Sequence, residues 1–199
     1  MTRDTLQDQG DKIWVWRHPR ATGAASRCIG TTDLPVDRRK AKRLARRVLQ
    51  TARRFALPRV VITSALQRSA DVGRWLRRWG WIHRIDASIG ELDFGAWDGR
   101  PWSAIEREQI DAWCADFLHH APGGGERLSL MLERARSWRA AGAIVVIGHA
   151  GWMLARQWLQ EGREPPRTSA DWPCAPRYGA LWKLDSNIRA DGVACDIAP

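Results

Sequence analysis

Hydrophobic and polar positions follow two alternating patterns along this chain. Short apolar runs rich in β-branched and aromatic residues, at 12–17, 59–63 and 143–147, are typical of buried strands. Between and after them, apolar residues recur at helical spacing over longer stretches. This order of strands and helices predicts an α/β fold, in which helices pack against a mostly parallel sheet.

The stretch 37–55 has the clearest helical pattern. Asp37 is a predicted N-cap, and a second helix, which carries Trp75, is predicted after the strand at 59–63. A third helix is predicted at 152–160, after the last apolar run. The apolar face of the first helix consists of Ala41, Leu44, Ala45, Val48, Leu49, Ala52 and Phe55.

The middle and the end of the chain have shorter patterns. Glycines at 123–125 break the chain, and Glu126 is predicted to open an amphipathic helix. We also expect a short strand at 81–87, a loop at 91–102, helical stretches at 103–109 and 111–118, and an edge strand at 178–184.

The length and composition indicate one globular domain. At 199 residues, with 44 % hydrophobic and 27 % charged residues, the chain suits one full core and is too short for two ordinary domains. We expect that domain at 12–199, after a loose polar tail at 1–11. No apolar run is long enough to cross a bilayer and the tail does not resemble a signal peptide, so we expect no membrane partner and a cytoplasmic protein.

The four cysteines are scattered and none forms a Cys-x-x-Cys pair. This spacing argues against a zinc site and against a dense disulfide framework. We expect free thiols at Cys28, Cys114, Cys174 and Cys195.

The formal net charge of +10 comes mostly from arginine, and many basic residues lie on the polar face of the 37–55 helix. A basic face of this kind is typical either of a nucleic-acid site or of an ordinary solvated helix surface. We favour the solvated surface, because neither interleaved aromatic residues nor a reading motif accompanies the charge. Nucleic acid is therefore not an expected partner.

Basic side chains follow the ends of three predicted strands. Arg17 and His18 follow the first strand, Arg68 follows the second, and His149 follows the last. Because such junctions lie at one edge of a parallel sheet, all four groups can converge on one small anion. A neutral imidazole beside arginines is a usable nucleophile, and arginines orient the oxygens of a transferring phosphoryl group.

The loop at 91–102 contains acids next to tryptophans, and Glu91 is the candidate acid within it. A carboxyl group in apolar surroundings has a raised pKa and can give a proton to a leaving alkoxide. With arginines neutralising the phosphoryl oxygens, this chemistry needs no metal ion. Taken singly, each of these residues could equally be an ordinary polar residue at a strand end.

In this order, the motifs resemble those of the histidine phosphatase superfamily, also called phosphoglycerate-mutase-like. The resemblance covers about 13–182 and is carried by Arg17-His18, Ser64-x-Leu66-x-Arg68, Glu91-x-x-Phe94-Gly95-x-Trp97-x-Gly99, Pro122 and Gly148-His149-Ala150-Gly151. It implies a three-layer α/β/α sandwich with a mostly parallel central sheet.

The resemblance also implies a role for each site residue. His18 would be phosphorylated, Glu91 would be the proton donor, and Arg17, Arg68 and His149 would form the phosphate pocket. The resemblance implies neither a metal nor another cofactor, and the partner would be a small phosphorylated substrate. The further substrate-binding residues would be Cys28, Ile29, Gly30 and Ala150.

Within that family the chain is most similar to α-ribazole phosphatases, which act in cobalamin nucleotide-loop assembly. Arg17-His18-Pro19, 28–35 and 94–102 carry this similarity. Pro19, Ala65 and Ala150 depart from the commonest family residues. The alternatives are a phosphatase or mutase of another small metabolite, a nucleic-acid-binding domain, and an inactive relative that only binds; a homodimer stays open.

Overall fold

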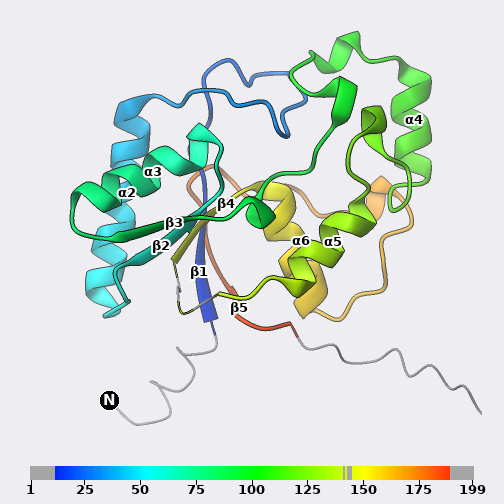
Figure 1. Cartoon of the computed structure of the whole chain (residues 1–199). Helices are drawn as coiled ribbons and strands as arrows, with labels where there is room; N and C mark the ends of the chain where they lie inside the picture. The colour runs from blue at the N-terminus through cyan, green and yellow to red at the C-terminus, as the bar shows by residue number, and fades with distance from the viewer. Residues whose placement is uncertain (1–11, 141, 143–144, 189–199) are drawn as a thin grey trace, which may run out of the picture.

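The computed structural model describes residues 12–140, 142 and 145–188, so the expected tail at 1–11 and Cys195 lie outside the described residues. Five strands form one sheet in the order β3-β2-β4-β1-β5 (Figure 1). All neighbouring pairs are parallel except β1 with β5, which is antiparallel. The strands are β1 (Lys12–Arg17), β2 (Val60–Thr63), β3 (Ile82–Ile85), β4 (Val145–Gly148) and β5 (Leu181–Asp185).

Helices cover both faces of the sheet, as Figure 1 shows. Helices α2 (Arg38–Arg54) and α3 (Gln67–Arg78) pack on one face, and α5 (Leu128–Ser137) and α6 (Ala150–Gln160) pack on the other. The remaining α-helix of the described residues, α4 (Arg107–Ala115), stands away from the sheet. The expected three-layer α/β/α fold with a mostly parallel sheet is therefore confirmed.

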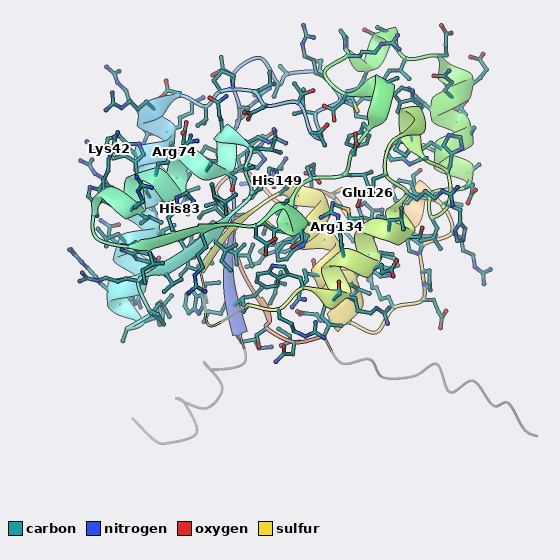
Figure 2. All side chains as sticks on the ribbon, in the orientation of Figure 1. Lys42, Arg74, His83, Glu126, Arg134 and His149 are labelled. Carbon is teal, nitrogen blue, oxygen red and sulfur yellow. The ribbon has the colours of Figure 1, made fainter. Side chains whose placement is uncertain are left out.

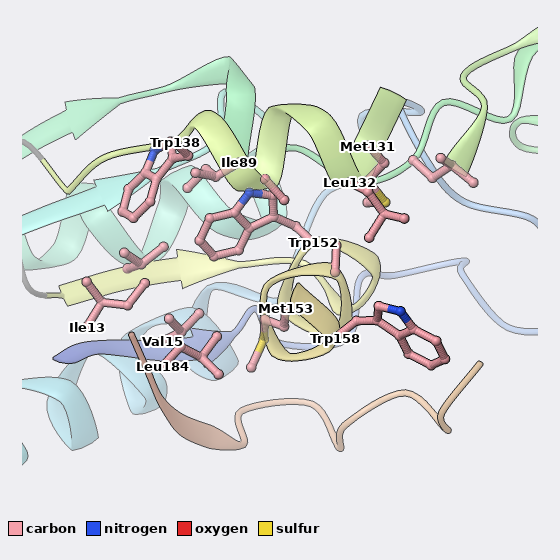
Figure 3. Packing of buried hydrophobic residues seen from close by; sticks show 14 of the residues in the cluster. Ile13, Val15, Ile89, Met131, Leu132, Trp138, Trp152, Met153, Trp158 and Leu184 are labelled. Carbon is pink, nitrogen blue, oxygen red and sulfur yellow. The ribbon is translucent and has the colours of Figure 1, made fainter. Parts of the chain in front are cut away.

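Alternate side chains of β1 enter the two halves of the core, because successive residues of a strand point to opposite faces. Ile13 and Val15 pack with Trp152 of α6 (Figure 3), whereas Trp14 and Trp16 pack on the face covered by α2. All these side chains are buried. A strand that is apolar on both faces belongs inside a sheet covered by two helical layers.

Helix α2 matches its predicted range to within a residue at each end. The Asp37 carboxylate accepts hydrogen bonds from the backbone N–H groups of Arg39 and Lys40, at 2.7 and 3.0 Å, so this residue is the N-cap. None of the helices in the described part of the chain is long and apolar enough to span a membrane.

The prediction of two helical stretches at 103–109 and 111–118 was wrong. A short 3₁₀ turn at Trp102–Ala104 comes first, and the single helix α4 begins at Arg107. Between them Ile105 has an extended backbone, and its side chain is buried against Cys28 and Trp97. Burying Ile105 interrupts the helical path.

Two other helices begin at different residues from those predicted. Helix α5 begins at Leu128, because Glu126 is bound elsewhere. The Glu126 backbone N–H donates to the Asp93 carbonyl, and the Glu126 carboxylate accepts a hydrogen bond from Arg134. Helix α6 begins at Ala150, earlier than the predicted start at 152.

The last strand is an edge strand, as predicted, but it begins three residues later than expected. Gly179 forms a turn at a φ of +72°, which glycine adopts without a steric cost. Its backbone N–H donates to the Arg17 carbonyl, so this turn closes against the end of β1.

Candidate active site

Three adjacent strands end side by side at one edge of the sheet. His149 follows β4, the middle strand of the three, and lies between His18, which follows β1, and Ser64, which follows β2. The register pairs Arg17 with Gly148, and the His18 backbone N–H donates to the Gly148 carbonyl at 3.0 Å. The two imidazole rings are consequently 4.8 Å apart between centroids.

The hydrogen bonding of His18 fixes its tautomer. Its Nδ1 lies 2.7 Å from the carbonyl oxygen of Pro19, which can only accept, so Nδ1 carries the proton. Burial, then the charge of Arg68, lowers the pKa of His18 to about 3. The ring is therefore neutral at pH 7, with a free electron pair on Nε2, which is the property a nucleophile requires.

His149 is fully buried and bonded on one side only. Its Nε2 is 2.7 Å from the Ser64 hydroxyl, whereas its Nδ1 has no partner within the described residues. Burial, followed by the nearness of His18 and Arg68, keeps the pKa of His149 well below its usual value. Ser64 is itself fixed, because its backbone N–H donates to Ser69, whose hydroxyl donates to the Ile147 carbonyl.

Arg68 reaches the site from the first turn of α3. Its guanidinium donates to the carbonyl oxygens of Thr32 and Gly30, and the side chain is 1 % exposed. These two bonds engage only part of the five N–H groups that an arginine carries. The remaining donors are available to an anion beside His18.

Asp98 holds the loop to which Arg68 binds. Its carboxylate accepts from the backbone N–H groups of Gly30, Thr31 and Thr32 and from both threonine hydroxyls. Burial by itself would raise the pKa of Asp98. The hydrogen bonds to its carboxylate, led by those from Thr32 and Thr31, have the larger combined effect, and the pKa of Asp98 is lowered. Asp98 thus binds the backbone N–H groups of the loop at 30–32, and Arg68 binds the carbonyl groups of Gly30 and Thr32.

Arg17, the last residue of β1, directly precedes His18. One of its NH groups donates to the Pro176 carbonyl, and its guanidinium carbon lies 3.9 Å from the centroid of the Tyr178 ring. Its Nε is buried and has no partner within the described residues. Tyr178 also faces the His18 ring, at 5.7 Å between centroids.

Glu91 is held at the N-terminus of α6. Its Oε1 accepts from the backbone N–H groups of Gly151, at 2.9 Å, and Leu92, at 3.1 Å. Its Oε2 forms no hydrogen bond with any residue that the structure describes. Burial raises the pKa of Glu91, and the hydrogen bond from Leu92 and the charge of Arg68 oppose that rise only in part. This carboxyl group is therefore suited to carry a proton.

The backbone around Glu91 is bound by an arginine of α5. Arg134 donates to the carbonyl oxygens of Ser88, Gly90 and Glu91 at 2.7 to 3.2 Å. The same guanidinium forms two hydrogen bonds with the Glu126 carboxylate, at 2.6 and 2.9 Å (Figure 2). We call Arg134 and Glu126 the Arg134 clamp.

Four of the groups described above line one cavity of about 480 Å³. Arg17, His18, Arg68 and Glu91 line it, as do Ile29 and Ala150 of the expected substrate-binding residues. His149 does not line the cavity but lies against His18.

Two of the four further substrate-binding residues expected from the sequence are not part of the cavity wall. The Cys28 side chain is 0 % exposed and packs with Trp97 and Ile105, and burial raises the pKa of its thiol to about 12. Gly30 instead accepts a hydrogen bond from Arg68. Neither residue lines the cavity, and the substrate contacts expected at Cys28 and Gly30 stay a prediction.

Several residues of the site were not found by sequence reasoning. The sequence places Ser64 in a motif and Tyr178 at the start of a predicted strand, and neither pattern indicates a role in the site. Asp98 and the Arg134 clamp act on loops far from them in sequence, so no periodic pattern indicates them. Among the described residues, no group of three or more His, Cys, Asp or Glu side chains is arranged to hold a metal ion.

Comparisons with known proteins agree with this geometry. The sequence model of the histidine phosphatase superfamily (branch 1) matches residues 13–168. A comparison with curated proteins found no match.

Solved structures share the fold. A mycobacterial glucosyl-3-phosphoglycerate phosphatase is 23 % identical with a TM-score of 0.68, over 87 % of this chain and 89 % of that one. Bacillus stearothermophilus YhfR is 19 % identical with a TM-score of 0.69, over 89 % and 94 %. A phosphoglycerate mutase from Thermus thermophilus is 26 % identical with a TM-score of 0.58, over 78 % and 88 %.

Proposed function

The chain belongs to the histidine phosphatase superfamily and is an enzyme with phosphatase activity, and we propose that it hydrolyses phosphate monoesters through a phosphohistidine on His18. The observation that carries this proposal is the hydrogen bond from Nδ1 of His18 to the Pro19 carbonyl. It leaves Nε2 unprotonated in a ring that burial and two arginines keep neutral.

In the first step, the electron pair on Nε2 attacks phosphorus, and the bond from phosphorus to the leaving oxygen breaks. Arg17 and Arg68 bind the phosphoryl oxygens from the cavity wall. Nδ1–H of His149, which lies behind the cavity wall against His18, donates to the same oxygens. The anion thereby gives partners to the buried nitrogens of Arg17 and His149 that lack one within the described residues. Donation by Nδ1 of His149 requires its Nε2 to accept the hydrogen of the Ser64 hydroxyl.

Glu91 donates a proton in the first step and accepts one in the second. Its protonated Oε2 gives the proton to the leaving alkoxide, and the resulting carboxylate then takes a proton from the attacking water. That water bonds to phosphorus as the bond to Nε2 breaks, and inorganic phosphate leaves. No step of this route requires a metal ion.

For the natural substrate we propose α-ribazole 5′-phosphate. Support comes from Arg17-His18-Pro19 and the segments 28–35 and 94–102, which resemble those of α-ribazole phosphatases. The substrates named for the solved relatives, glucosyl-3-phosphoglycerate and phosphoglycerate, are the rival small metabolites.

Rapid quenching with ³²P-labelled substrate tests the proposal. We expect acid-labile label on the wild-type protein before steady state, no label and no turnover for His18→Ala, and full activity in the presence of a chelator. A panel of α-ribazole phosphate, 3-phosphoglycerate and p-nitrophenyl phosphate then tests the substrate. Inhibition by the chelator, or the absence of a phosphoenzyme, would contradict the phosphohistidine route.

A further inference from the structure

The cavity that contains His18 has a second, aromatic part. We propose that this part binds a flat, uncharged aromatic or apolar group on the leaving alcohol, and that it makes the enzyme select such substrates over carboxylated ones. This inference rests on the proposed phosphatase function, because it concerns the alcohol side of the same substrate.

Five aromatic side chains form a continuous wall, which we call the aromatic wall. Trp102 lies next to Phe94, at 6.0 Å between centroids, and Phe94 next to Trp113, at 5.8 Å. Trp113 in turn lies 5.1 Å from Phe117, which lies 6.0 Å from Trp172. All five residues line the cavity. Rings at these separations offer edges and faces to a further ring.

The aromatic wall is built by segments outside the sheet. Helix α4 supplies Trp113, and Phe117 follows that helix closely. Trp172 follows the short 3₁₀ turn Ser169–Asp171 and also packs on Trp158 of α6, at 5.3 Å between centroids. Helix α4, which Figure 1 shows standing away from the sheet, therefore serves to enclose the substrate side of the cavity.

The rest of this part of the cavity is aliphatic. Leu128 and Met131 of α5 and Leu154 of α6 line it together with Ile29. Removing apolar surface of a ligand from water against such walls is favourable. Pockets with mostly apolar walls and a few convergent polar groups are typical of sites for small organic molecules.

The charges around the cavity are placed unevenly. Among the described residues that line it, the cationic side chains are Arg17 and Arg68 at the phosphate site, and Arg27. Arg27 is exposed, near the partly exposed Trp102, and donates to the Gly99 carbonyl. A carboxylate on the leaving group would lose water against the aromatic wall without gaining a buried cation, which is unfavourable.

Two pairs of compounds separate binding from turnover. 2-Phenylethylphosphonate and ethylphosphonate cannot be hydrolysed at the P–C bond, so calorimetric titration measures their binding alone. 2-Phenylethyl phosphate and ethyl phosphate have primary alcohols of similar acidity as leaving groups, so the ratio of their kcat/KM values reports the contribution of the ring. We expect a preference of about tenfold or more for the phenyl compound in both pairs, and weaker turnover of 3-phosphoglycerate than of 2-phenylethyl phosphate.

Trp172→Leu should reduce both ratios about tenfold, since it removes a ring but keeps an apolar side chain. Trp75→Leu, on the opposite side of the sheet, is the matched control and should leave both ratios as in the wild type. Circular dichroism checks that each variant is folded.

The failures of the two proposals are distinguishable. Phosphate hydrolysis with no phenyl preference, or with 3-phosphoglycerate as the better substrate, would overturn the aromatic site and leave the phosphatase intact. A phenyl preference among the phosphonates, without a phosphoenzyme from any phosphate, would support the aromatic site and overturn the phosphohistidine route.

Discussion

At the scale of single residues, the site is built from histidines that the protein keeps uncharged. His18 and His149 are both buried, lie 4.8 Å apart between ring centroids, and have Arg68 among the causes of their lowered pKa values. An imidazolium in either position would lie in a low dielectric beside a permanent cation. The arrangement suits an anion, which restores the balance of charge when it binds.

The lowered pKa of His18 predicts that acid destabilises the fold. An unfolded histidine has a pKa of 6.5, and that of folded His18 is about 3, so the unfolded chain binds more protons between these values. The stability due to this residue is present above pH 6.5 and is lost as the pH falls below it. Between pH 7 and pH 5, His18 alone should lower the free energy of unfolding by about 2 kcal/mol.

Urea unfolding of the wild type and of His18→Asn at the two pH values measures this effect. The variant should lose about 2 kcal/mol less stability than the wild type between pH 7 and pH 5. His119→Asn, which changes an exposed histidine, is the control and should lose as much as the wild type. Equal losses in the wild type and in His18→Asn would show that His18 is not kept neutral by the fold.

Residues at strand ends could be predicted from the sequence, because the topology of a parallel sheet brings them together. Arg17, His18 and Arg68 were placed at one edge on that ground alone. The partner of His149 could not be predicted, because Ser64 is 85 residues away and any small polar residue at that strand end would fit the same pattern. The buried position of Cys28 depends on packing against Trp97 and Ile105, which sequence periodicity does not describe.

At the scale of elements, α5 acts on the site through a residue that does not line the cavity. Arg134 of α5 binds three backbone carbonyl groups at and just before Glu91 and is itself held by Glu126. The glycine-rich break at 123–125 allows Glu126 to reach that guanidinium rather than to begin the helix. We therefore interpret the Arg134 clamp as a positioning device for the proton donor.

Arg134→Lys should impair only reactions that need a donated proton. Lysine keeps the charge beside Glu126 but cannot form the forked set of hydrogen bonds. Displacing a catalytic group by about 1 Å costs up to about 100-fold in rate, so kcat for an alkyl phosphate should fall by up to that factor. The kcat for p-nitrophenyl phosphate, whose leaving group hardly needs a proton, should change little.

Glu91→Gln gives the reference for complete loss of the proton donor, and Arg136→Lys, at an exposed position of the same helix, is the matched control. A thermal melt of each variant accompanies the kinetics. Equal losses on both substrates would indicate general damage to the fold, and unchanged turnover of the alkyl phosphate would show that the clamp does not position Glu91.

The elements themselves were predictable where the hydrophobic pattern was strong. Helix α2 has a regular apolar stripe and a capping aspartate, and its predicted ends differ from the observed ones by a single residue. Helix α4 has no fully buried residue and no side-chain cap, so its sequence has little that could define its limits. The site also depends on loops at 30–32 and 91–99, which are fixed by Asp98 and Arg134 through contacts that are remote in sequence.

At the scale of the whole molecule, the net charge of +10 is concentrated on the polar face of α2. Within the described residues, none of the basic side chains of this helix forms an ion pair with a carboxylate. Two tryptophans of the α3 region, Trp75 and Trp79, lie beside this face, with ring centroids 5.9 Å apart. In the sequence, no aromatic residues are interleaved with these charges, and that absence argues against a nucleic-acid site. In the structure, two aromatic residues do lie next to the basic face.

Even so, basic side chains of the protein already lie over the Trp75 ring. Arg38, Lys42 and Arg78 lie 4.8 to 5.3 Å from the centroid of Trp75. Cation–π contacts of this kind compete with a base for the same ring. We therefore keep the prediction of a solvated face that attracts polyanions only through charge.

That prediction can be tested with a fluorescent single-stranded oligonucleotide. Binding by charge alone weakens steeply as salt displaces phosphate contacts, so anisotropy should detect no complex above about 0.2 M salt. If a base stacked on Trp75, that contact would contribute about 1–3 kcal/mol to the binding free energy. If only charge holds the oligonucleotide, Trp75→Leu should leave the affinity at low salt unchanged. Arg43→Gln, which removes one exposed charge of α2, should weaken it. A complex that survives about 0.2 M salt and is lost in Trp75→Leu would instead identify this face as a nucleic-acid site.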